Sequence, residues 1–271
     1  MSYLLAIFLG IIQGLTEFLP ISSSGHLIFL HDLFYLENID NLIFDVALHL
    51  GTLIALVVYF YKDIIRYFQA FIKSLVKWQV GSDQDQKIAW LLLLSMLPAG
   101  IADYFLEDVI SNVFRDSLSV AIVLLLVSFI FFIAEKYSQQ QKEINSLTCR
   151  KIIILGCAQA LALIPGVSRS GITIVAGLGL NLKREAAARI SFLMSIPIVF
   201  AVGLKKVYDL SQQEINSLTI ILLVFGLLSA AITGYFCLKY FLRYVQNHSL
   251  NIFAYYRIVL AVIVLIAIWA R

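Results

Sequence analysis

Charged residues are scarce in this sequence. Asp, Glu, Lys and Arg make up 14% of its 271 residues, whereas 61% are hydrophobic and the mean hydropathy is +0.91. A soluble domain of this length cannot bury so much apolar surface in one core. Charge-free stretches long enough to cross a bilayer lie at 118–134 and 218–238, and a third at 252–270 is broken only by Arg257. The composition excludes a soluble globular domain and indicates an integral membrane protein.

A strongly basic surface and a cysteine framework are also lacking. The net charge is +3, and the 20 Lys and Arg residues are dispersed among apolar runs, which excludes a nucleic-acid partner but not phosphate or anionic lipid. Cys149, Cys157 and Cys237 have neither paired nor metal-ligand spacing, so we expect small packing residues. No basic region opens the chain, and Gln13 and Glu17 interrupt its first apolar stretch. We therefore expect that stretch to be retained rather than cleaved as a signal peptide.

Eight apolar segments run along the chain, at 3–19, 42–61, 88–106, 118–134, 152–164, 190–204, 218–238 and 252–270. Two of them, 3–19 and 152–164, stop at Pro20 and Pro165 and continue into Ser/Gly-rich stretches at 20–25 and 165–171. Such stretches cannot be helical throughout. The sequence predicts an all-α polytopic membrane protein, a single domain over 1–271, with two re-entrant helical hairpins and about six transmembrane helices.

The two broken regions match each other at an offset of 146 residues without gaps. The matching pairs are Gly10 with Gly156, Gln13 with Gln159, Leu15 with Leu161, Ser22 with Ser168, Ser24 with Ser170, and Gly25 with Gly171. The prolines miss by one position, so the alignment alone is suggestive. It predicts an internal duplication, with repeat one at about 1–135 and repeat two at about 150–271.

The distribution of Lys and Arg tests this arrangement. If hairpin one returns to the outer side and hairpin two to the cytoplasmic side, with 62–87 as a cytoplasmic loop, 14 of the 20 basic residues lie inside and four outside. A full crossing of 152–182 would move five of them outside and only two inside. The positive-inside bias therefore favours re-entry. The repeats then have inverted topology, and the hairpin tips meet at a cavity near the midplane, as in many transporters.

A carboxylate lies within the first membrane segment. Glu17 and Gln13 are four residues apart and share a helix face near the break at Pro20. Ionisable residues at this depth are functional by default, although a neighbouring helix could also satisfy Glu17. The carboxylate and amide oxygens could hold a hard divalent cation shared with substrate phosphates, with Mg²⁺ preferred and Ca²⁺ as the alternative.

Polar residues also follow each break. Ser22, Ser23, Ser24, Gly25 and His26 offer hydroxyls, N–H groups and an imidazole. As a pattern the run is typical of a flexible turn, but beside a membrane carboxylate it suggests a nucleophile with acid and base groups.

In the second repeat, Arg169 takes the position of Ser23. An arginine at this depth requires an anionic partner, either Glu17 or a phosphate group. Hydroxyl donors and backbone that can approach a ligand surround it, at Ser168, Ser170, Thr173, Gly166 and Gly171. Together these residues predict a phosphate cradle.

Other polar residues in the apolar segments are weaker candidates. Asp45, His49 and Asp103 either line the cavity or pair locally, and local pairing is favoured. Arg257 is expected to snorkel or to pair with a carboxylate.

At these residues the sequence resembles the bacterial undecaprenyl pyrophosphate phosphatases of the bacitracin-resistance type. That family is recognised by Glu/Gln-x-x-x-Glu followed by Phe-Leu-Pro-x-Ser-Ser-x-Gly-His, and by Pro-Gly-x-Ser-Arg-Ser-x-x-Thr. Here the motifs read Gln13-Gly-Leu-Thr-Glu17-Phe-Leu-Pro-Ile-Ser-Ser-Ser-Gly-His26 and Pro165-Gly-Val-Ser-Arg-Ser-Gly-Ile-Thr173. Length and hydropathy fit over the whole chain.

The resemblance implies removal of the terminal phosphate from a C55 isoprenoid pyrophosphate, which recycles the carrier for cell-wall synthesis, at the outer face of the cytoplasmic membrane. It makes Glu17 essential for metal binding or acid–base chemistry, Ser23 the nucleophile or a phosphate contact, His26 a proton carrier and Arg169 the phosphate clamp. Substrate binding is expected at Gln13, Ser22, Ser24, Gly166, Ser168, Ser170 and Thr173. Many relatives have glutamate where Gln13 stands, so this chain has one carboxylate fewer at the implied metal site.

The alternative is a transporter or lipid flippase for a phosphorylated substrate, because that class shares inverted repeats with broken helices. It predicts substrate movement without bond cleavage. A Ser, His and Glu group opposite a buried arginine suits phosphate-ester chemistry better. The sequence leaves the oligomeric state open, a homodimer included.

Overall fold

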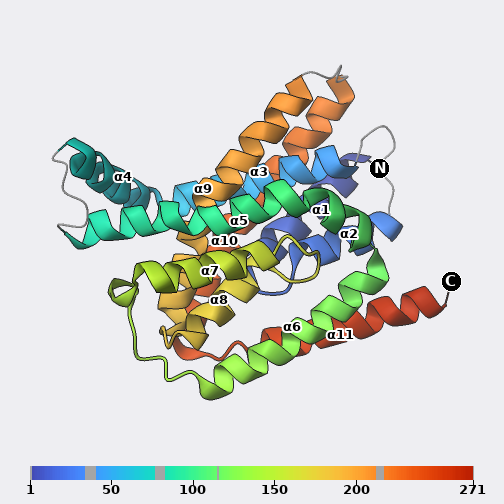
Figure 1. The fold of residues 1–271 in the computed structure, drawn as a ribbon. Coiled ribbons are helices and arrows are strands. Elements are labelled where there is room, and N and C mark those ends of the chain that lie inside the picture. The colour runs from blue at the N-terminus through green and yellow to red at the C-terminus, as the bar shows by residue number, and fades with distance from the viewer. Residues whose placement is uncertain (1, 34–40, 77–82, 115, 212–216, 271) are drawn as a thin grey trace.

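The fold is given by a computed structural model that describes residues 2–33, 41–76, 83–114, 116–211 and 217–270 (Figure 1). Within these ranges the chain is helical apart from turns and a single β-bridge between Lys142 and Leu182. The helices are α1 (Ser2–Phe18), α2 (Ser23–Leu33), α3 (Asn41–Tyr59), α4 (Tyr61–Val76), α5 (Gln84–Val113), α6 (Ser117–Tyr137), the 3₁₀ turn η1 (Ile144–Ser146), α7 (Cys149–Leu161), α8 (Arg169–Gly179), α9 (Arg184–Ser211), α10 (Ser217–Asn247) and α11 (Asn251–Trp269).

Several helices can cross a membrane. In the described ranges five are long and apolar enough: Gln84–Leu106 of α5, α6, Arg184–Lys205 of α9, α10 and α11. A sixth span arises if α3 and α4 are counted as one bent pair. The prediction of an all-α polytopic membrane protein with about six spans is confirmed.

The two broken segments fold as hairpins. Each has a second arm, α2 or α8, of only 11 residues. Such an arm rises about 16 Å, roughly half of a hydrocarbon core about 30 Å thick. The first arm, α1 or α7, ends just before the proline, and the two arms of each hairpin contact each other. Neither α2 nor α8 is therefore long enough to cross the membrane.

The two halves exchange packing partners. Helices α1 and α3 pack on α10, whereas α7 and α9 pack on α5, and α6 lies beside α11 (Figure 1). The matched glycines Gly10 and Gly156 both allow close helix contact. A Cβ at Gly10 would lie 2.5 Å from the carbonyl oxygen of Gly226 in α10, and one at Gly156 would lie 2.7 Å from that of Ser95 in α5. An internal duplication would produce such reciprocal packing, and the duplication stays a prediction.

Helix α4 differs from the expectation of a cytoplasmic loop over 62–87. It bends 77° away from α3. One of its faces buries Tyr67, Ala70 and Ser74, and the helix packs on α5. Apolar side chains on the other face are exposed, at Tyr61, Ile65, Phe68, Ile72 and Leu75. This pattern is typical of an amphipathic helix lying in the membrane interface.

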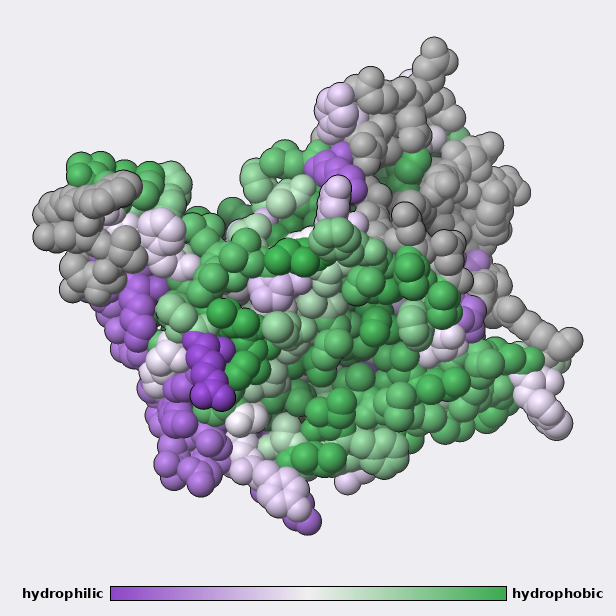
Figure 2. Space-filling model, viewed as in Figure 1, coloured by the Kyte–Doolittle hydropathy of each residue, from purple (hydrophilic) through white to green (hydrophobic). Residues whose placement is uncertain are grey.

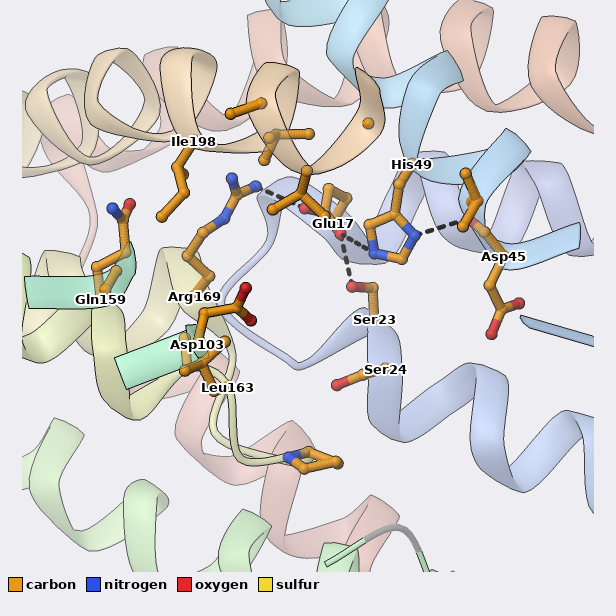
Figure 3. Close-up of a pocket in the computed structure, with 18 of the residues that line it drawn as sticks. Glu17, Ser23, Ser24, Asp45, His49, Asp103, Gln159, Leu163, Arg169 and Ile198 are labelled. Carbon is orange, nitrogen blue, oxygen red and sulfur yellow. Dashed lines mark hydrogen bonds and ion pairs between the residues drawn. The ribbon is translucent and has the colours of Figure 1, made fainter. Parts of the chain in front are cut away.

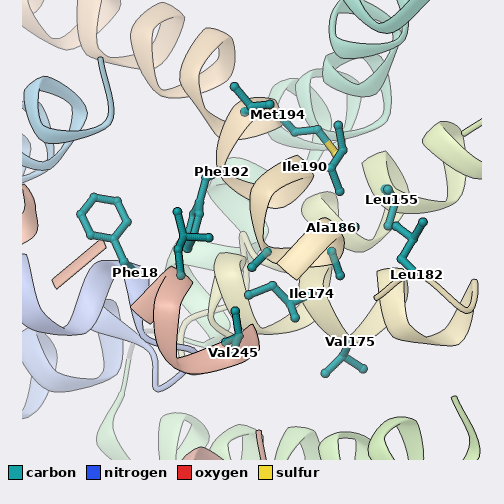
Figure 4. Close-up of a cluster of buried hydrophobic side chains, with 14 of the residues drawn as sticks. Phe18, Leu155, Ile174, Val175, Leu182, Ala186, Ile190, Phe192, Met194 and Val245 are labelled. Carbon is teal, nitrogen blue, oxygen red and sulfur yellow. The ribbon is translucent and has the colours of Figure 1, made fainter. Parts of the chain in front are cut away.

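The core and the surface agree with a membrane setting. The main cluster of buried apolar side chains includes residues of α1, α7, α8, α9 and α10, and within it Phe18 packs edge-on against Phe192 at 5.7 Å (Figure 4). Apolar side chains also cover most of the visible surface, and hydrophilic ones gather at its left edge (Figure 2). Of the cysteines expected to pack, Cys237 is buried but Cys149 and Cys157 are exposed, because both lie on the outward side of α7.

Candidate active site

The Glu17 carboxylate is the centre of the site. Its Oε1 accepts a hydrogen bond from Arg169 Nη2 at 2.6 Å. Its Oε2 accepts from Ser23 Oγ at 2.6 Å and from Gln13 Nε2 at 3.0 Å. The carboxylate is buried, and groups from both hairpins converge on it (Figure 3). Arg169 therefore has the anionic partner that the sequence required, and that partner is Glu17.

Helix geometry brings these groups together. Ser23 is the first residue of α2, and Arg169 is the first residue of α8. Both half-helices begin at the hairpin tips, so their N-termini, which carry free N–H groups and partial positive charge, lie at the site. Such an arrangement stabilises an anion.

The two tips have the same local structure. Ser22 and Ser168 adopt left-handed backbone conformations, with φ of 72° and 71°. Each hydroxyl accepts from the N–H of the glycine three residues on, Gly25 or Gly171, at 3.2 and 3.1 Å. Each also lies 3.2 Å from the hydroxyl two residues on, that of Ser24 or Ser170. These serines cap α2 and α8 and fix the direction of Ser23 and Arg169.

Ser170 and Thr173 are buried behind the site. Ser170 Oγ lies 3.3 Å from the carbonyl oxygens of Glu17 and of Leu19, so it ties hairpin two to hairpin one. Thr173 Oγ1 donates to the carbonyl of Arg169 at 2.7 Å or interacts with Ser191 Oγ at 2.5 Å. Both residues, predicted to bind substrate, contact protein groups in this structure.

His26, predicted to carry protons, is directed away from Glu17. Its Nδ1 lies 2.7 Å from the carbonyl oxygen of Ser22, and its Nε2 lies 2.8 Å from the hydroxyl of Tyr256 in α11. The imidazole stacks on the Tyr256 ring at 5.7 Å. Both ring nitrogens are thus engaged outside the Glu17–Ser23 pair.

His49 occupies the place at Glu17 instead. It lies on α3, and its Nε2 is 3.7 Å from Glu17 Oε2. Its Nδ1 is 2.8 Å from the carbonyl oxygen of Asp45, which can only accept, so Nδ1 carries a proton and Nε2 faces the carboxylate. Asp45 itself bonds to His31 at 2.9 Å, as local pairing predicts. Both Asp45 and His49 thus have local partners, and both also line the cavity.

Arg257 neither snorkels nor pairs with a carboxylate. It is fully buried, and its guanidinium donates to the carbonyls of Gly166 and Val167 at 2.8 and 3.1 Å. Its guanidinium also lies over the Phe131 ring at 5.7 Å. Gly166, with φ of +92°, therefore serves the turn of hairpin two, and Arg257 holds that turn in place.

A cavity of about 660 Å³ opens over Glu17 and Arg169. Of the predicted site residues, Glu17, Ser23, Ser24, Ser168 and Arg169 line it. Polar residues from other elements join them, at His49, Asp45, Asp103, Gln159 and Lys205, and the remaining wall is largely apolar. The cavity thus combines a cationic and hydroxyl-bearing end with apolar walls.

The donor set suits a cation only when a ligand shares it. Among the described residues, no group of three or more His, Cys, Asp or Glu side chains is arranged to hold a metal ion. Gln13 Oε1, however, is buried without a hydrogen-bond partner. One carboxylate and one amide oxygen fit Mg²⁺ that takes its other ligands from water and substrate phosphates. A cation bound by protein alone does not fit.

The fold and these contacts define an integral membrane protein that handles an anionic group at bilayer depth. The particular family follows from comparison. The model of the bacitracin resistance protein BacA family matches residues 6–263, so the chain belongs to that family.

Three relatives illustrate how far the similarity extends. The chain is 41% identical over 273 residues to the undecaprenyl-diphosphatase of Moorella thermoacetica, covering 100% of both chains. It is 42% identical over 261 residues to that of Elusimicrobium minutum and 40% identical over 267 residues to that of Thermomicrobium roseum, covering 96% of each chain in both cases.

Proposed function

We propose that this protein hydrolyses undecaprenyl pyrophosphate to undecaprenyl phosphate and inorganic phosphate. The reaction recycles the lipid carrier for cell-wall synthesis and gives bacitracin resistance. The observation that carries the proposal is the Glu17 carboxylate held between Arg169 and the Ser23 hydroxyl in an apolar-walled cavity. The relatives' shared name agrees with this chemistry.

Catalysis depends on positioning and charge. The terminal phosphate binds Arg169 and the N-termini of α2 and α8, which stabilise the charge on its oxygens. Ser23 Oγ, or a water molecule that it orients, attacks phosphorus in line, and Glu17 accepts the proton. The bond from phosphorus to the bridging oxygen breaks, and its electron pair leaves with the lipid monophosphate. A covalent phosphoserine would then be hydrolysed by water.

A divalent cation is part of the proposal. Glu17 and Gln13 Oε1 would hold it together with the pyrophosphate. When bound, it would neutralise phosphate charge. Mg²⁺ is preferred and Ca²⁺ is the alternative.

The isoprenoid chain leaves the cavity across α5. The cavity shares Met96 and Gly100 with a shallow apolar groove on that helix, lined also by Leu97, Ile101, Tyr104 and Phe105. Leu97, Ile101, Tyr104 and Phe105 are exposed on the lipid-facing side. The pyrophosphate would remain at Arg169 while the chain extends into lipid.

We place the protein in the bacterial cytoplasmic membrane with its site open to the outer face. The positive-inside bias puts the C-terminal ends of α5 and α9 outside. The cavity reaches Ile110 near the end of α5 and Lys205 near that of α9. Cysteine labelling from outside should modify a residue placed at position 110 and not one at position 87. Labelling in the reverse pattern would overturn the orientation.

Phosphate release from undecaprenyl pyrophosphate by purified protein, with and without EDTA, tests the activity. Wild-type release that depends on divalent metal and is lost in Glu17→Ala and Arg169→Ala would support the proposal. No release in any divalent metal from well-folded wild type would favour a transporter or flippase. Ser23→Ala with near-normal turnover would exclude the covalent route.

A further inference from the structure

Gln159 is a buried amide whose polar atoms lack partners. It lies on α7, is 3% exposed and lines the cavity that holds Arg169. Neither its Oε1 nor its Nε2 has a hydrogen-bond partner in the described part of the chain. Arg169 Nη1 is likewise buried without a partner there. Leaving buried polar groups unpaired costs free energy, so such groups beside one cavity indicate a ligand that completes them.

The duplication explains why this amide is left over. Its match in repeat one, Gln13, donates to Glu17, four residues further on and one helical turn away. Four residues after Gln159 stands Leu163, which has no acceptor. Repeat two thus keeps the amide but not the carboxylate that satisfies it in repeat one.

The order of groups along the cavity suggests which acceptor the amide meets. Arg169 lies between Glu17 on one side and Gln159 on the other (Figure 3). Arg169 Nη2 donates to Glu17, whose other carboxylate oxygen accepts from Ser23, and the proposed function places the terminal phosphate at these groups. Nη1 and the amide of Gln159 therefore remain for a second anionic group on the opposite side of the guanidinium.

We propose that Gln159 Nε2, with Arg169 Nη1, binds the phosphate that stays attached to the lipid. This assignment rests on the proposed function and extends it to a second phosphate subsite. When the bond from the terminal phosphorus to the bridging oxygen breaks, the electron pair goes to that oxygen. Donors on the lipid-bearing phosphate then stabilise the departing charge, and the proton from the nucleophile goes to Glu17.

Inorganic pyrophosphate and inorganic phosphate separate the two subsites without requiring turnover. Pyrophosphate spans both positions, whereas phosphate fills only one. The affinity of purified protein for each anion can be measured by calorimetry. Gln159→Leu should weaken the affinity for pyrophosphate about tenfold or more, because a hydrogen bond to a charged group is lost, and should leave the affinity for phosphate within about twofold of wild type. Gln159→Glu should weaken pyrophosphate further because it adds a like charge.

Thermal stability gives an independent readout. Gln159→Leu removes no hydrogen bond of the described structure, so its melting temperature should equal or exceed that of wild type. Gln86→Leu is the matched control: Gln86 is also buried but lies at the start of α5 and does not line the cavity, so this change should leave pyrophosphate binding intact.

Three results would overturn the assignment. They are unchanged pyrophosphate binding in Gln159→Leu, equal weakening of phosphate and pyrophosphate, and a lower melting temperature that accounts for the loss. These outcomes are distinct from failure of the proposed function, which would be shown by wild type that binds pyrophosphate but releases no phosphate from the lipid substrate.

Discussion

Glu17 meets two demands through its two oxygens. Oε1 pairs with the guanidinium of Arg169, and Oε2 accepts a hydrogen bond from the Ser23 hydroxyl. In the proposed mechanism, a phosphate that binds Arg169 would take the place of Oε1 there, so the buried cation would remain paired with an anion throughout. An unpaired buried charge would be costly, and this exchange would avoid it. Glu17 would then be left to act as a base through Oε2.

His49 should matter for turnover although the family motifs do not include it. Its Nε2 faces the same oxygen that serves Ser23. We expect His49→Ala to lower kcat about 100-fold or more with KM within about threefold, because proton transfer by a positioned side chain contributes roughly 10²- to 10⁴-fold. His248→Ala is the control. Like His49, His248 has its Nδ1 close to the carbonyl oxygen four residues earlier, that of Tyr244, at 3.1 Å, but its side chain is exposed at the end of α10. Equal activities of the two variants would contradict the prediction.

Gln13 offers a test of the shared metal site. Gln13→Glu would place a second carboxylate where the amide now lies 3.0 Å from Glu17 Oε2. Two like charges at that distance repel unless a cation lies between them. The Mg²⁺ concentration for half-maximal phosphate release should therefore fall about tenfold. Gln86→Glu is the control, and an unchanged Mg²⁺ titration would count against Gln13 as a ligand.

Residue types and spacing were sufficient to predict the centre of the site but not its periphery. Glu17 and Arg169 could be named because an ionisable residue in an apolar run needs a reason, whereas Ser23 was singled out from its neighbours by the family resemblance. The contact of His49 with Glu17 could not be predicted, because it joins residues 32 positions apart and depends on how α3 packs beside hairpin one. The contact of His26 with Tyr256 spans 230 positions and was likewise beyond local pattern. The roles assigned to these residues stay predictions.

At the scale of elements, the two hairpins could be predicted from the sequence, whereas helix α4 was not predicted. Pro20 and Pro165 interrupt apolar runs, and an interrupted run is visible in hydropathy alone. Helix α4 has a mixed composition, and its apolar residues appear as a helical face only when periodicity is counted. Packing between α1 and α10 was also invisible, because it depends on small residues far apart in the sequence.

That packing gives a prediction about helix association. A Cβ at Gly10 would lie 2.0 Å from Ser229 Oγ and 2.5 Å from the carbonyl oxygen of Gly226, and the backbone atom cannot rotate away. Gly10→Ala should therefore destabilise the protein by about 1–3 kcal/mol, seen as a lower melting temperature in detergent. Gly179→Ala is the control, because nothing lies within 4 Å of a Cβ there. A Gly10→Ala protein as stable as wild type would show that α1 and α10 are less closely packed.

At the scale of the whole molecule, the two hairpins and the helices around them make one cavity with a polar end and an apolar route to lipid. Its volume of about 660 Å³ leaves most of a C55 chain outside. Two glycines that line the cavity differ in the space beside them. A Cβ at Gly203 would lie 2.8 Å from Leu50 Cδ2, so the wall is closely packed there, whereas a Cβ at Gly100 would meet nothing within 4 Å. The side of α5 at Gly100 is therefore the open one.

Filling this route should discriminate between long and short substrates. Gly100→Ala, Gly100→Leu and Gly100→Phe add increasing volume at the rim that the cavity shares with the outer groove, and replacing glycine within a helix favours folding. For undecaprenyl pyrophosphate, kcat/KM should fall in that order, by about tenfold or more for Phe, because apolar contact with the chain is lost. For a five-carbon isoprenyl pyrophosphate, which is too short to extend along the outer groove of α5, kcat/KM should stay within about twofold. Gly179→Phe, the control, should leave kcat/KM unchanged for both substrates. If Gly100→Phe changed kcat/KM equally for the long and the short substrate, the isoprenoid chain would have to leave the cavity by another path.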